Sequence, residues 1–493
     1  MNKIIDFKEA LTFDDILLVP QESHVLPKEV DVSANLTKNI KLQIPIISAA
    51  MDTVTEWKMA IALAQAGGMG ILHKNMSIER QAVEVKLVKR AESGVILDPI
   101  TLTIDKTLRN ALAVMRQHGI SGLPVVNDKN KLLGILTGRD IRFEEDLDRS
   151  VSECMTKDNL VTAPINTTLH QARSILQKNR IEKLLLVNKD SELAGMITVK
   201  DILKKEEHPS ATLDEHGRLR VGAAIGVTKD VLERIGALVD VHVDLLVLDS
   251  AHGHSKGVLQ TVEKIKKTYS SLPLIAGNVA TPEGTQALID AGADTVKVGI
   301  GAGASCTTRV VAGIGGPQLT AVLDCCEVAE KQGILVISDG GVRFSGDVAK
   351  SIAAGASSVM IGSLLAGMDE SPGETLLYEG RQYKTFRGMG SLGPMSEGSA
   401  DRYFQDCEDN IKLVPEGIEG MVPFRGKVND FIFQIVGGLR ASMGYCGVKT
   451  ISEMQTNTKF VRVTSAGGIE SHPHNVRIVK EAPNYQVMKV LGD

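Results

Sequence analysis

The segment 298–309 carries the residue types best suited to covalent chemistry. It reads Val-Gly-Ile-Gly-Ala-Gly-Ala-Ser-Cys-Thr-Thr-Arg, so Cys306 follows three alternating glycines and precedes two threonines and an arginine. A glycine-rich turn lets backbone N–H groups approach a ligand closely, and such dipoles or nearby cations can activate a thiol as a nucleophile. A free cysteine more often packs as a small hydrophobic residue. Because Cys306 lies in a polar, glycine-rich loop instead of an apolar run, we predict a catalytic role.

This segment resembles the inosine-5′-monophosphate (IMP) dehydrogenase family. Gly299-Ile300-Gly301 and Cys306-Thr-Thr-Arg309 stand as they do in that family, and later segments extend the resemblance over nearly the whole chain. The resemblance implies NAD-dependent oxidation of IMP to xanthosine 5′-monophosphate (XMP) through a covalent Cys306 thioimidate. This reaction is the committed step of guanine nucleotide synthesis.

Composition narrows the class of protein. The chain has 493 residues, 43% of them apolar and 23% charged, which predicts a globular protein with more than one domain. A net charge of −5 gives no electrostatic footprint for nucleic acid or an anionic membrane as a main partner. We find no apolar run of membrane-spanning length and no signal-peptide core. Six scattered cysteines without a C-x-x-C pair argue against a zinc site or disulfide framework and favour the cytoplasm.

Short apolar runs recur along the chain, and they predict the strands that must position Cys306. Continuous apolar strands that alternate with helices are typical of a parallel sheet covered by helices, and eight such units favour a (β/α)8 TIM barrel of the α/β class. A gap-free internal repeat, Ala291–Gly299 against Ala354–Gly362, supports this interpretation over a doubly wound sheet. The predicted strands are Pro45–Ala49, Met69–His73, Arg220–Gly226, Leu245–Ser250, Pro273–Asn278, Thr295–Gly301, Leu335–Asp339 and Ser358–Ser363, with helices at Glu56–Ala66 and Pro282–Ala291 among the connections.

A second duplication interrupts the barrel between its second and third strands. Leu123–Ile141 recurs as Leu184–Ile202, with the Thr-Gly-Arg-Asp of 137–140 matching the Thr-Val-Lys-Asp of 198–201. This pattern resembles a tandem CBS (Bateman) domain, in which the Thr and Asp commonly hold the ribose of ATP or GTP. The pair either binds such a nucleotide or only rigidifies the protein. The predicted domains are a barrel at 1–92 and 206–493, with a mobile flap at about 380–425, and an insert at 93–205 with copies at about 98–148 and 156–205.

Polar and small residues follow most predicted strands, where the chemistry of such barrels occurs. Asp339-Gly340-Gly341 and Gly362-Ser363 follow strands seven and eight, the usual phosphate site of this fold. The glycines at 299, 301 and 303 do not form a Rossmann motif, because position 304 is alanine. By resemblance, the substrate-binding residues are Ser48, Met51, Asn278, Ser305, Asp339, Gly340, Gly341, Gly362, Ser363, Phe386, Gly388, Met389, Gly390 and Glu416, and Asp249, Gly299, Ile300 and Gly301 face the cofactor.

The stretch after strand eight is too long for an ordinary connection and has the composition of an active-site lid. Arg402 within it would be a poor general base on pKa grounds, because a guanidinium stays protonated. Only the resemblance assigns Arg402 to water activation with Tyr403 orienting it, and it offers Thr308 and Glu416 as a second proton route. Read without the resemblance, Glu416 is a surface carboxylate.

A cation site is also implied by the resemblance alone. Glu470-Ser471-His472 precedes a proline and a second histidine, and a turn there is the simpler interpretation of the H-x-H pattern. In the family, carbonyls at these positions complete a potassium site in a neighbouring subunit, together with carbonyls of Gly301, Gly303 and Cys306. A homotetramer is therefore expected.

Two departures from the family pattern concern the nucleotide phosphate. Ala304 stands where the family has a phosphate-contacting serine, and Phe386 stands where it has a tyrosine. Loss of a hydrogen bond to a charged group costs about 1.5–3 kcal/mol. We therefore expect a raised KM for the nucleotide unless Ser305 or water compensates.

Two alternatives are considered, the nearest a related enzyme and the other a protein of another class. A GMP reductase shares the cysteine loop and barrel, but the Arg-Tyr lid and the inserted pair disfavour it. A CBS-based nucleotide sensor with an inactive barrel is disfavoured because Cys306 and Arg402 are both intact.

Overall fold

The computed structural model describes residues 8–91, 96, 99–403 and 413–485, without the side chains of residues 201, 204 and 205. The chain divides into two compact units. The first takes Met1–Lys89, Ser210–Thr212 and Leu219–Asp493, and the second takes Arg90–Pro209 and Leu213–Arg218.

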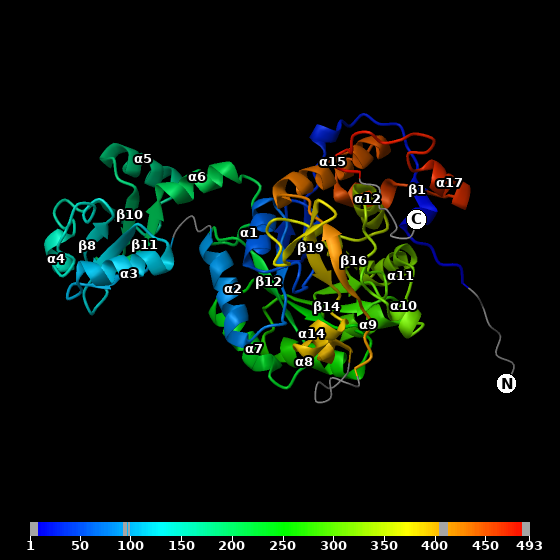
Figure 1. Ribbon diagram of the computed structural model, residues 1–493, viewed down its shortest axis with the longest axis horizontal. Helices are drawn as coiled ribbons and strands as arrows, with labels where there is room; N and C mark the ends of the chain where they lie inside the picture. Colours follow the sequence, from blue (N-terminus) through cyan, green and yellow to red (C-terminus); the bar gives the residue numbers. More distant parts are fainter. Residues whose placement is uncertain (1–7, 92–95, 97–98, 404–412, 486–493) are drawn as a thin grey trace. The chain divides into compact units, whose positions relative to one another are not determined.

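An eight-stranded parallel sheet forms the centre of the first unit (Figure 1). The strand order is β4-β17-β16-β15-β14-β13-β12-β5, and a parallel bridge from Ile47 to Met69 joins the two ends into a closed barrel. The predicted (β/α)8 barrel is thereby confirmed, with strand boundaries within a few residues of those expected. The strands are β4 (Ile46–Ser48), β5 (Gly70–Leu72), β12 (Val221–Ile225), β13 (Leu245–Asp249), β14 (Leu274–Val279), β15 (Thr295–Val298), β16 (Leu335–Asp339) and β17 (Ser358–Ile361).

The barrel strands are apolar and buried on both faces. Val221–Ile225 and Leu245–Asp249 are buried at every position, because side chains on one face fill the barrel and those on the other pack against helices. The core of the barrel gathers residues from several strands, including Ile47, Ile71, Val247 and Ile337.

Helices follow the strands and cover the outside of the sheet (Figure 1). Thr281 begins one of them, since its hydroxyl accepts from the N–H of Gly284 and a proline occupies the first turn. The main helices are α1 (Trp57–Gln65), α2 (Ile78–Ala91), α7 (Val231–Asp240), α8 (Lys256–Thr268), α9 (Pro282–Asp290), α11 (Gln318–Glu330), α12 (Ser345–Ala353), α15 (Val428–Cys446) and α16 (Ile451–Asn457). Among the described residues, we find no helix long and apolar enough to cross a membrane.

The segment after β17 contains a small antiparallel sheet and short helical turns that lead to Arg402. The sheet has the order β18-β19-β20. Its register pairs Phe386 with Gly420 and Arg387 with Glu419. The elements are α13 (Ser363–Ala366), β18 (Thr375–Tyr378), β19 (Arg381–Arg387), α14 (Leu392–Ser396), the 3₁₀ turn η3 (Ser399–Tyr403) and β20 (Glu419–Pro423).

The remaining elements of the first unit are short. They are η1 (Phe13–Asp15), β1 (Ile16–Leu18), η2 (Pro27–Glu29), β2 (Ala34–Thr37), β3 (Ile40–Leu42), α10 (Thr308–Val311), β21 (Phe460–Arg462) and α17 (Ser465–Glu470). The N-terminal strand β1 pairs antiparallel with β21, so both ends of the described chain are attached to this unit.

The second unit consists of two similar halves, as the sequence duplication predicts. Each half has a three-stranded sheet, β6-β7-β8 in the first and β9-β10-β11 in the second. The turns before β8 and β11 pair with each other through Lys131 and Glu192, and Asn130 and Ser191 both have a positive φ there. The elements are β6 (Leu102–Thr103), α3 (Leu108–His118), β7 (Gly122–Val126), β8 (Leu132–Thr137), α4 (Val151–Cys154), β9 (Thr162–Pro164), α5 (Leu169–Asn179), β10 (Lys183–Val187), β11 (Leu193–Thr198) and α6 (Val199–Glu207).

Candidate active site

A cavity of about 370 Å³ opens at the carboxyl ends of the barrel strands. Its walls come from the loops after β4, β13, β14, β15, β16 and β17, and from the segment between β19 and β20. Cavities of this size accept a small organic ligand.

Cys306 lies on the wall of this cavity, in the loop after β15. The thiol is half-buried, and its sulfur lies 3.1 Å from the Thr308 hydroxyl oxygen. The backbone holds the loop, since the N–H of Cys306 donates to the Gly303 carbonyl and the N–H of Thr307 donates to the Glu416 carbonyl. In the thiolate form, the Thr308 hydroxyl is placed to donate to the sulfur. The geometry thus supplies an accessible thiol with a hydroxyl partner.

Gly299 explains why this turn requires glycine. Its φ is +152°, and an added Cβ would lie 1.9 Å from the carbonyl oxygen of Asp339. The backbone of β15 therefore passes directly against the end of β16, which brings the cysteine loop and the Asp339-Gly340-Gly341 turn to the same cavity.

A buried ionic cluster forms the floor of the cavity. The Lys297 side chain is 1% exposed, and its ammonium lies 3.0 Å from the Asp249 carboxylate and 2.6 Å from the Asp339 carboxylate. It also contacts the Asn278 amide oxygen, while the Asn278 amide nitrogen donates to Asp339 at 2.9 Å. One lysine thus holds three side chains at the ends of β13, β14 and β16.

Arg402 docks against the end of β13. Its guanidinium pairs with Asp249, whose side chain is 7% exposed. The N–H of Ala251 donates to the Arg402 carbonyl at 3.1 Å. The carboxylate of Asp249 therefore faces Lys297 with one oxygen and Arg402 with the other.

Tyr403 and Glu416 lie beside the cysteine loop. Burial raises the pKa of Tyr403, the adjacent Arg402 cation opposes the rise, and negative charge on Cys306 or Glu416 adds to it. The Tyr403 ring packs against Gly390, whose carbonyl accepts from the N–H of Glu416 at 2.9 Å. The phenol therefore stays protonated at neutral pH and can act as a hydrogen-bond donor.

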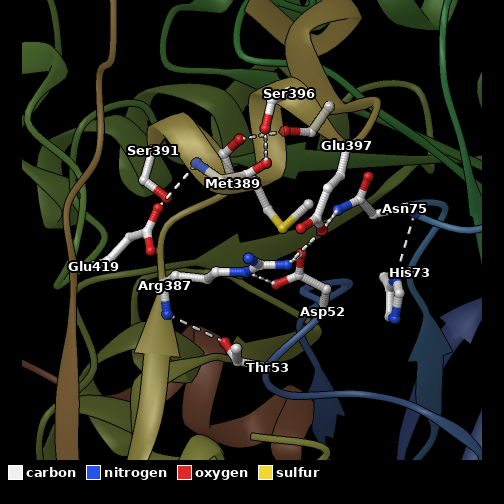
Figure 2. A network of polar contacts seen from close by, with 12 residues as sticks. Asp52, Thr53, His73, Asn75, Arg387, Met389, Ser391, Ser396, Glu397 and Glu419 are labelled. Atoms are coloured by element: carbon white, nitrogen blue, oxygen red, sulfur yellow. Dashed lines mark hydrogen bonds and ion pairs between the residues drawn. The ribbon is translucent and has the colours of Figure 1, made fainter.

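A polar network ties the start of this segment to the barrel (Figure 2). Arg387 makes two hydrogen bonds to the Asp52 carboxylate, at 3.2 and 2.9 Å, and a third to Glu397 at 2.7 Å. Asn75 donates to Asp52 at 2.9 Å, and its own N–H donates to the His73 ring. These bonds outweigh the effect of burial and raise the pKa of Arg387.

The cavity gathers most residues that the sequence singles out. Those that line it are Met51, Asp249, Asn278, Gly299, Ile300, Gly301, Gly303, Ser305, Cys306, Thr308, Asp339, Gly340, Gly341, Gly362, Ser363, Phe386, Gly388, Met389, Gly390, Arg402, Tyr403 and Glu416. Glu416 is thus a cavity residue, and its interpretation as a surface carboxylate is wrong.

Four singled-out residues do not line the cavity. Ser48 is fully buried, and its hydroxyl accepts from Thr55 at 2.8 Å, so it supports the wall from behind. Glu470, Ser471 and His472 are exposed at and after the end of α17.

Sequence reasoning missed several wall residues. Lys297 is the most important of them, and a lysine inside the apolar run of β15 is a signal that could have been used, because lysine is almost never fully buried without partners. Thr12 and Asp14 of the N-terminal segment and Arg343 after β16 also line the cavity. Nothing in their local sequence indicates this position.

The second unit holds the other predicted ligand residues. The Asp140 carboxylate accepts from both the N–H and the hydroxyl of Thr137, at 2.6 and 2.7 Å. The two halves contact each other through Arg139 and Glu182, at 2.9 Å. The side chain of Asp201 lies outside the described residues.

Comparison with known proteins gives a consistent result. Residues 10–474 match the family model described as the IMP dehydrogenase / GMP reductase domain. The chain is 59% identical over 478 residues to the inosine-5′-monophosphate dehydrogenase of Halalkalibacterium halodurans, which covers 97% of this chain and 98% of that protein. It is 57% identical to the one of Bacillus subtilis, again with 97% and 98% covered. Among solved structures, a GMP reductase of Trypanosoma brucei, crystallised with guanosine 5′-monophosphate, matches with a TM-score of 0.89 and 42% identity, covering 97% of this chain and 100% of that one.

Proposed function

Since this chain belongs to the IMP dehydrogenase / GMP reductase family, we propose that its chemistry runs through a covalent bond between Cys306 and the purine. Its activity is that of an IMP dehydrogenase, an oxidoreductase that converts IMP to XMP with NAD. The observation that carries the proposal is the position of the Cys306 thiol on the cavity wall, beside Thr308 and facing the same space as Arg402.

The reaction has two chemical stages. In the first, the Cys306 thiol would give up its proton and its sulfur would form a bond to C2 of the purine, while NAD, held by Asp249 and the Gly299–Gly301 turn, would supply the acceptor for the hydrogen that leaves C2 as hydride. The product is a thioimidate between Cys306 and the nucleotide. In the second stage water adds at C2, the C–S bond breaks, and XMP leaves while the thiol is restored.

Asp339 and the turns after β16 and β17 would hold the nucleotide. The Asp339 carboxylate can accept from the ribose hydroxyls, and the N–H groups of Gly341 and Ser363 with the Ser363 hydroxyl suit the phosphate. Lys297 fixes Asp339 from behind, so the acceptor is held in place before the nucleotide binds.

Asp249 would serve two partners in turn. In this structure Arg402 occupies one of its carboxylate oxygens. NAD bound against Asp249 and the Gly299–Gly301 turn needs the same carboxylate, so we infer that Arg402 must leave before the cofactor binds and return after it departs. A moving segment separates hydride transfer from hydrolysis in this way.

Arg402 would then act on water. The guanidinium bonded to the buried Asp249 is held at the cavity, and Tyr403 contributes a phenol beside it. By the resemblance, Arg402 would orient the water and take its proton as a neutral guanidine, a form it reaches only after giving one of its own protons to solvent, with Tyr403 positioning the group. Thr308 and Glu416, which also line the cavity, would form the second proton route.

Potassium would stabilise the cysteine loop. The loop from 299 to 309 contains no acidic side chain, and Gly303 is exposed, so its backbone carbonyls are a neutral donor set that fits a monovalent cation. We propose that Gly301, Gly303 and Cys306 supply carbonyls together with Glu470, Ser471 and His472 of a second subunit, in a homotetramer. The ion would hold the loop in shape, which keeps the thiol at the cavity.

The inserted unit is proposed to bind ATP or GTP between its two halves, with Thr137 and Thr198 on the ribose. The tandem-CBS interpretation rests on the duplicated strands and turns of this unit. The five described cysteines, at 154, 306, 325, 326 and 446, are free thiols, in keeping with the proposed cytoplasmic location.

The inserted pair does not exclude a GMP reductase activity, contrary to the expectation from the sequence, because the Trypanosoma brucei GMP reductase covers 97% of this chain, insert included. The dehydrogenase is favoured because the dehydrogenases of Halalkalibacterium halodurans and Bacillus subtilis share 59% and 57% identity with this chain and the reductase shares 42%.

The test is direct. Protein is mixed with IMP and NAD, NADH is followed by absorbance, and an acid-quenched sample is digested for mass spectrometry of the Cys306 peptide. We expect NADH and a nucleotide adduct on Cys306, and neither with Cys306→Ala. NADH production without any adduct would refute the covalent route, and oxidation of NADPH with GMP in its place would favour the reductase.

A further inference from the structure

The residue that precedes Arg402 has its own attachment to the barrel. Asp401 lies in η3, and its carboxylate pairs with the ammonium of Lys74, which follows β5 by two residues. The two side chains are only 18% and 10% exposed. An ion pair this well buried differs from a surface pair, because removing one partner leaves the other charge without compensation.

The end of β12 supplies the space for this pair. A Cβ added to Gly226 would lie 2.2 Å from a carboxylate oxygen of Asp401 and 2.7 Å from the Lys74 nitrogen. Any larger residue at 226 would displace both groups. The ends of three neighbouring strands therefore contact residues 401 and 402. Lys74 after β5 pairs with Asp401, Gly226 after β12 leaves room for that pair, and Asp249 at the end of β13 pairs with Arg402.

The electrostatics make Lys74 and Asp401 dependent on each other. Burial lowers the pKa of Lys74 and the charge of Asp401 opposes this, while the cations Arg402 and Arg234 add to the lowering. One oxygen of Asp401 has no hydrogen-bond partner in the described part of the chain. Lys74 is thus the main attachment of Asp401.

This attachment is separate from the network in Figure 2. Arg387 and Asp52 hold the start of the segment, whereas Lys74 holds the residue next to Arg402. Loss of the Lys74 contact therefore removes the attachment of the residue next to Arg402, and leaves Arg402 with its bonds to Asp249 and Ala251, while β19 stays in place.

We propose that Lys74 and Gly226 form a docking seat for Asp401, and that this seat positions Arg402 for the hydrolysis stage only. The inference rests on the proposed function, in which Arg402 leaves Asp249 while NAD is bound. In that state the seat is empty, so it contributes nothing to hydride transfer. Lys74 and Gly226 are positioning residues, and neither touches the purine.

The experiment separates the two stages. Lys74→Met, Asp401→Asn and Gly226→Ala are each mixed rapidly with saturating IMP and NAD, and the first turnover of NADH is compared with the steady-state rate. We expect the first turnover to stay within about twofold of the original protein and the steady-state rate to fall about tenfold or more. The Cys306 adduct should accumulate in acid-quenched samples.

Two comparisons isolate the pair itself. The double variant Lys74→Met/Asp401→Asn should be no slower than the worse single variant, because both changes remove one interaction. Lys331→Met is the control, since Lys331 pairs with Glu327 on the surface with both side chains about 70% exposed, and neither stage should change.

The outcomes are distinguishable. If the unaltered protein makes no NADH from IMP, the proposed function fails before the seat is tested. The seat is overturned if the variants keep the original steady-state rate, or if both stages fall together. Gly226→Ala removes no charge, so it still decides the question if Lys74→Met does not fold.

Discussion

Arg402 and Asp249 form a buried ion pair at the end of β13, although the family resemblance assigns one to hydrolysis and the other to the cofactor. The pair gives a physical reason for sequential use of the site, because a cofactor bound at Asp249, as the proposed function requires, would compete with the Arg402 guanidinium for the same carboxylate.

Asp249→Asn should weaken both uses. The amide keeps the shape of the side chain but loses its charge, and a hydrogen bond to a charged group contributes about 1.5–3 kcal/mol. We expect KM for NAD to rise about tenfold or more and the hydrolysis stage to slow. Steady-state kinetics with varied NAD would check this, and an unchanged KM with normal turnover would contradict the shared-carboxylate model.

Lys297→Met should raise KM for both IMP and NAD, since the lysine holds Asp339 on one side and Asp249 on the other. Loss of one partner from a buried ionic cluster costs about 3–5 kcal/mol of unfolding free energy. Lys384→Met is the matched control, because the Lys384 ammonium is buried against the carbonyls of Met368 and Ser371. The control should lose stability in urea unfolding without a change in either KM. If Lys297→Met has the same two KM values as the original protein, the bridging role is ruled out.

Phe386→Tyr should lower KM for IMP. Phe386 lines the cavity, so a hydroxyl there reaches the space in which the phosphate is expected. One hydrogen bond to a charged group predicts a change of about tenfold or more. Tyr383→Phe, on the same strand, is the control, since Tyr383 packs against Tyr378 away from the cavity wall. A KM that does not respond to Phe386→Tyr would show that Ser305 or water already compensates.

Alkylation should distinguish the thiols. Burial raises the pKa of Cys325 to about 11. Only about 0.1% of that thiol is ionised at pH 8, and the thiolate fraction rises about tenfold per pH unit until the pKa is reached. Iodoacetamide at pH 8 should therefore label Cys306, with protection by IMP, and leave Cys325 unlabelled. Labelling of Cys325 at pH 8, or no protection of Cys306 by IMP, would contradict the assignment.

The sequence by itself determined the barrel. Continuous apolar runs such as Leu245–Asp249, separated by helix-length segments, have few other ways to bury both faces of each strand. It also determined that Cys306 lies in the loop after β15, because the glycines and the cysteine are close together in the sequence, directly after an apolar run. The inserted domain was predicted from an internal repeat.

Tertiary structure alone decided which charged side chains form ion pairs with each other. Lys297, Asp249 and Asp339 lie on three different strands, and Lys74 meets Asp401 across more than 300 positions of sequence. No local pattern encodes such partners, since they depend on barrel register and on where the segment after β17 returns. The path of the chain after β17 also brings Glu416 beside the Cys306 loop. Ser48 was expected on the cavity wall from its place at the end of β4, but its contact with Thr55 buries it behind that wall.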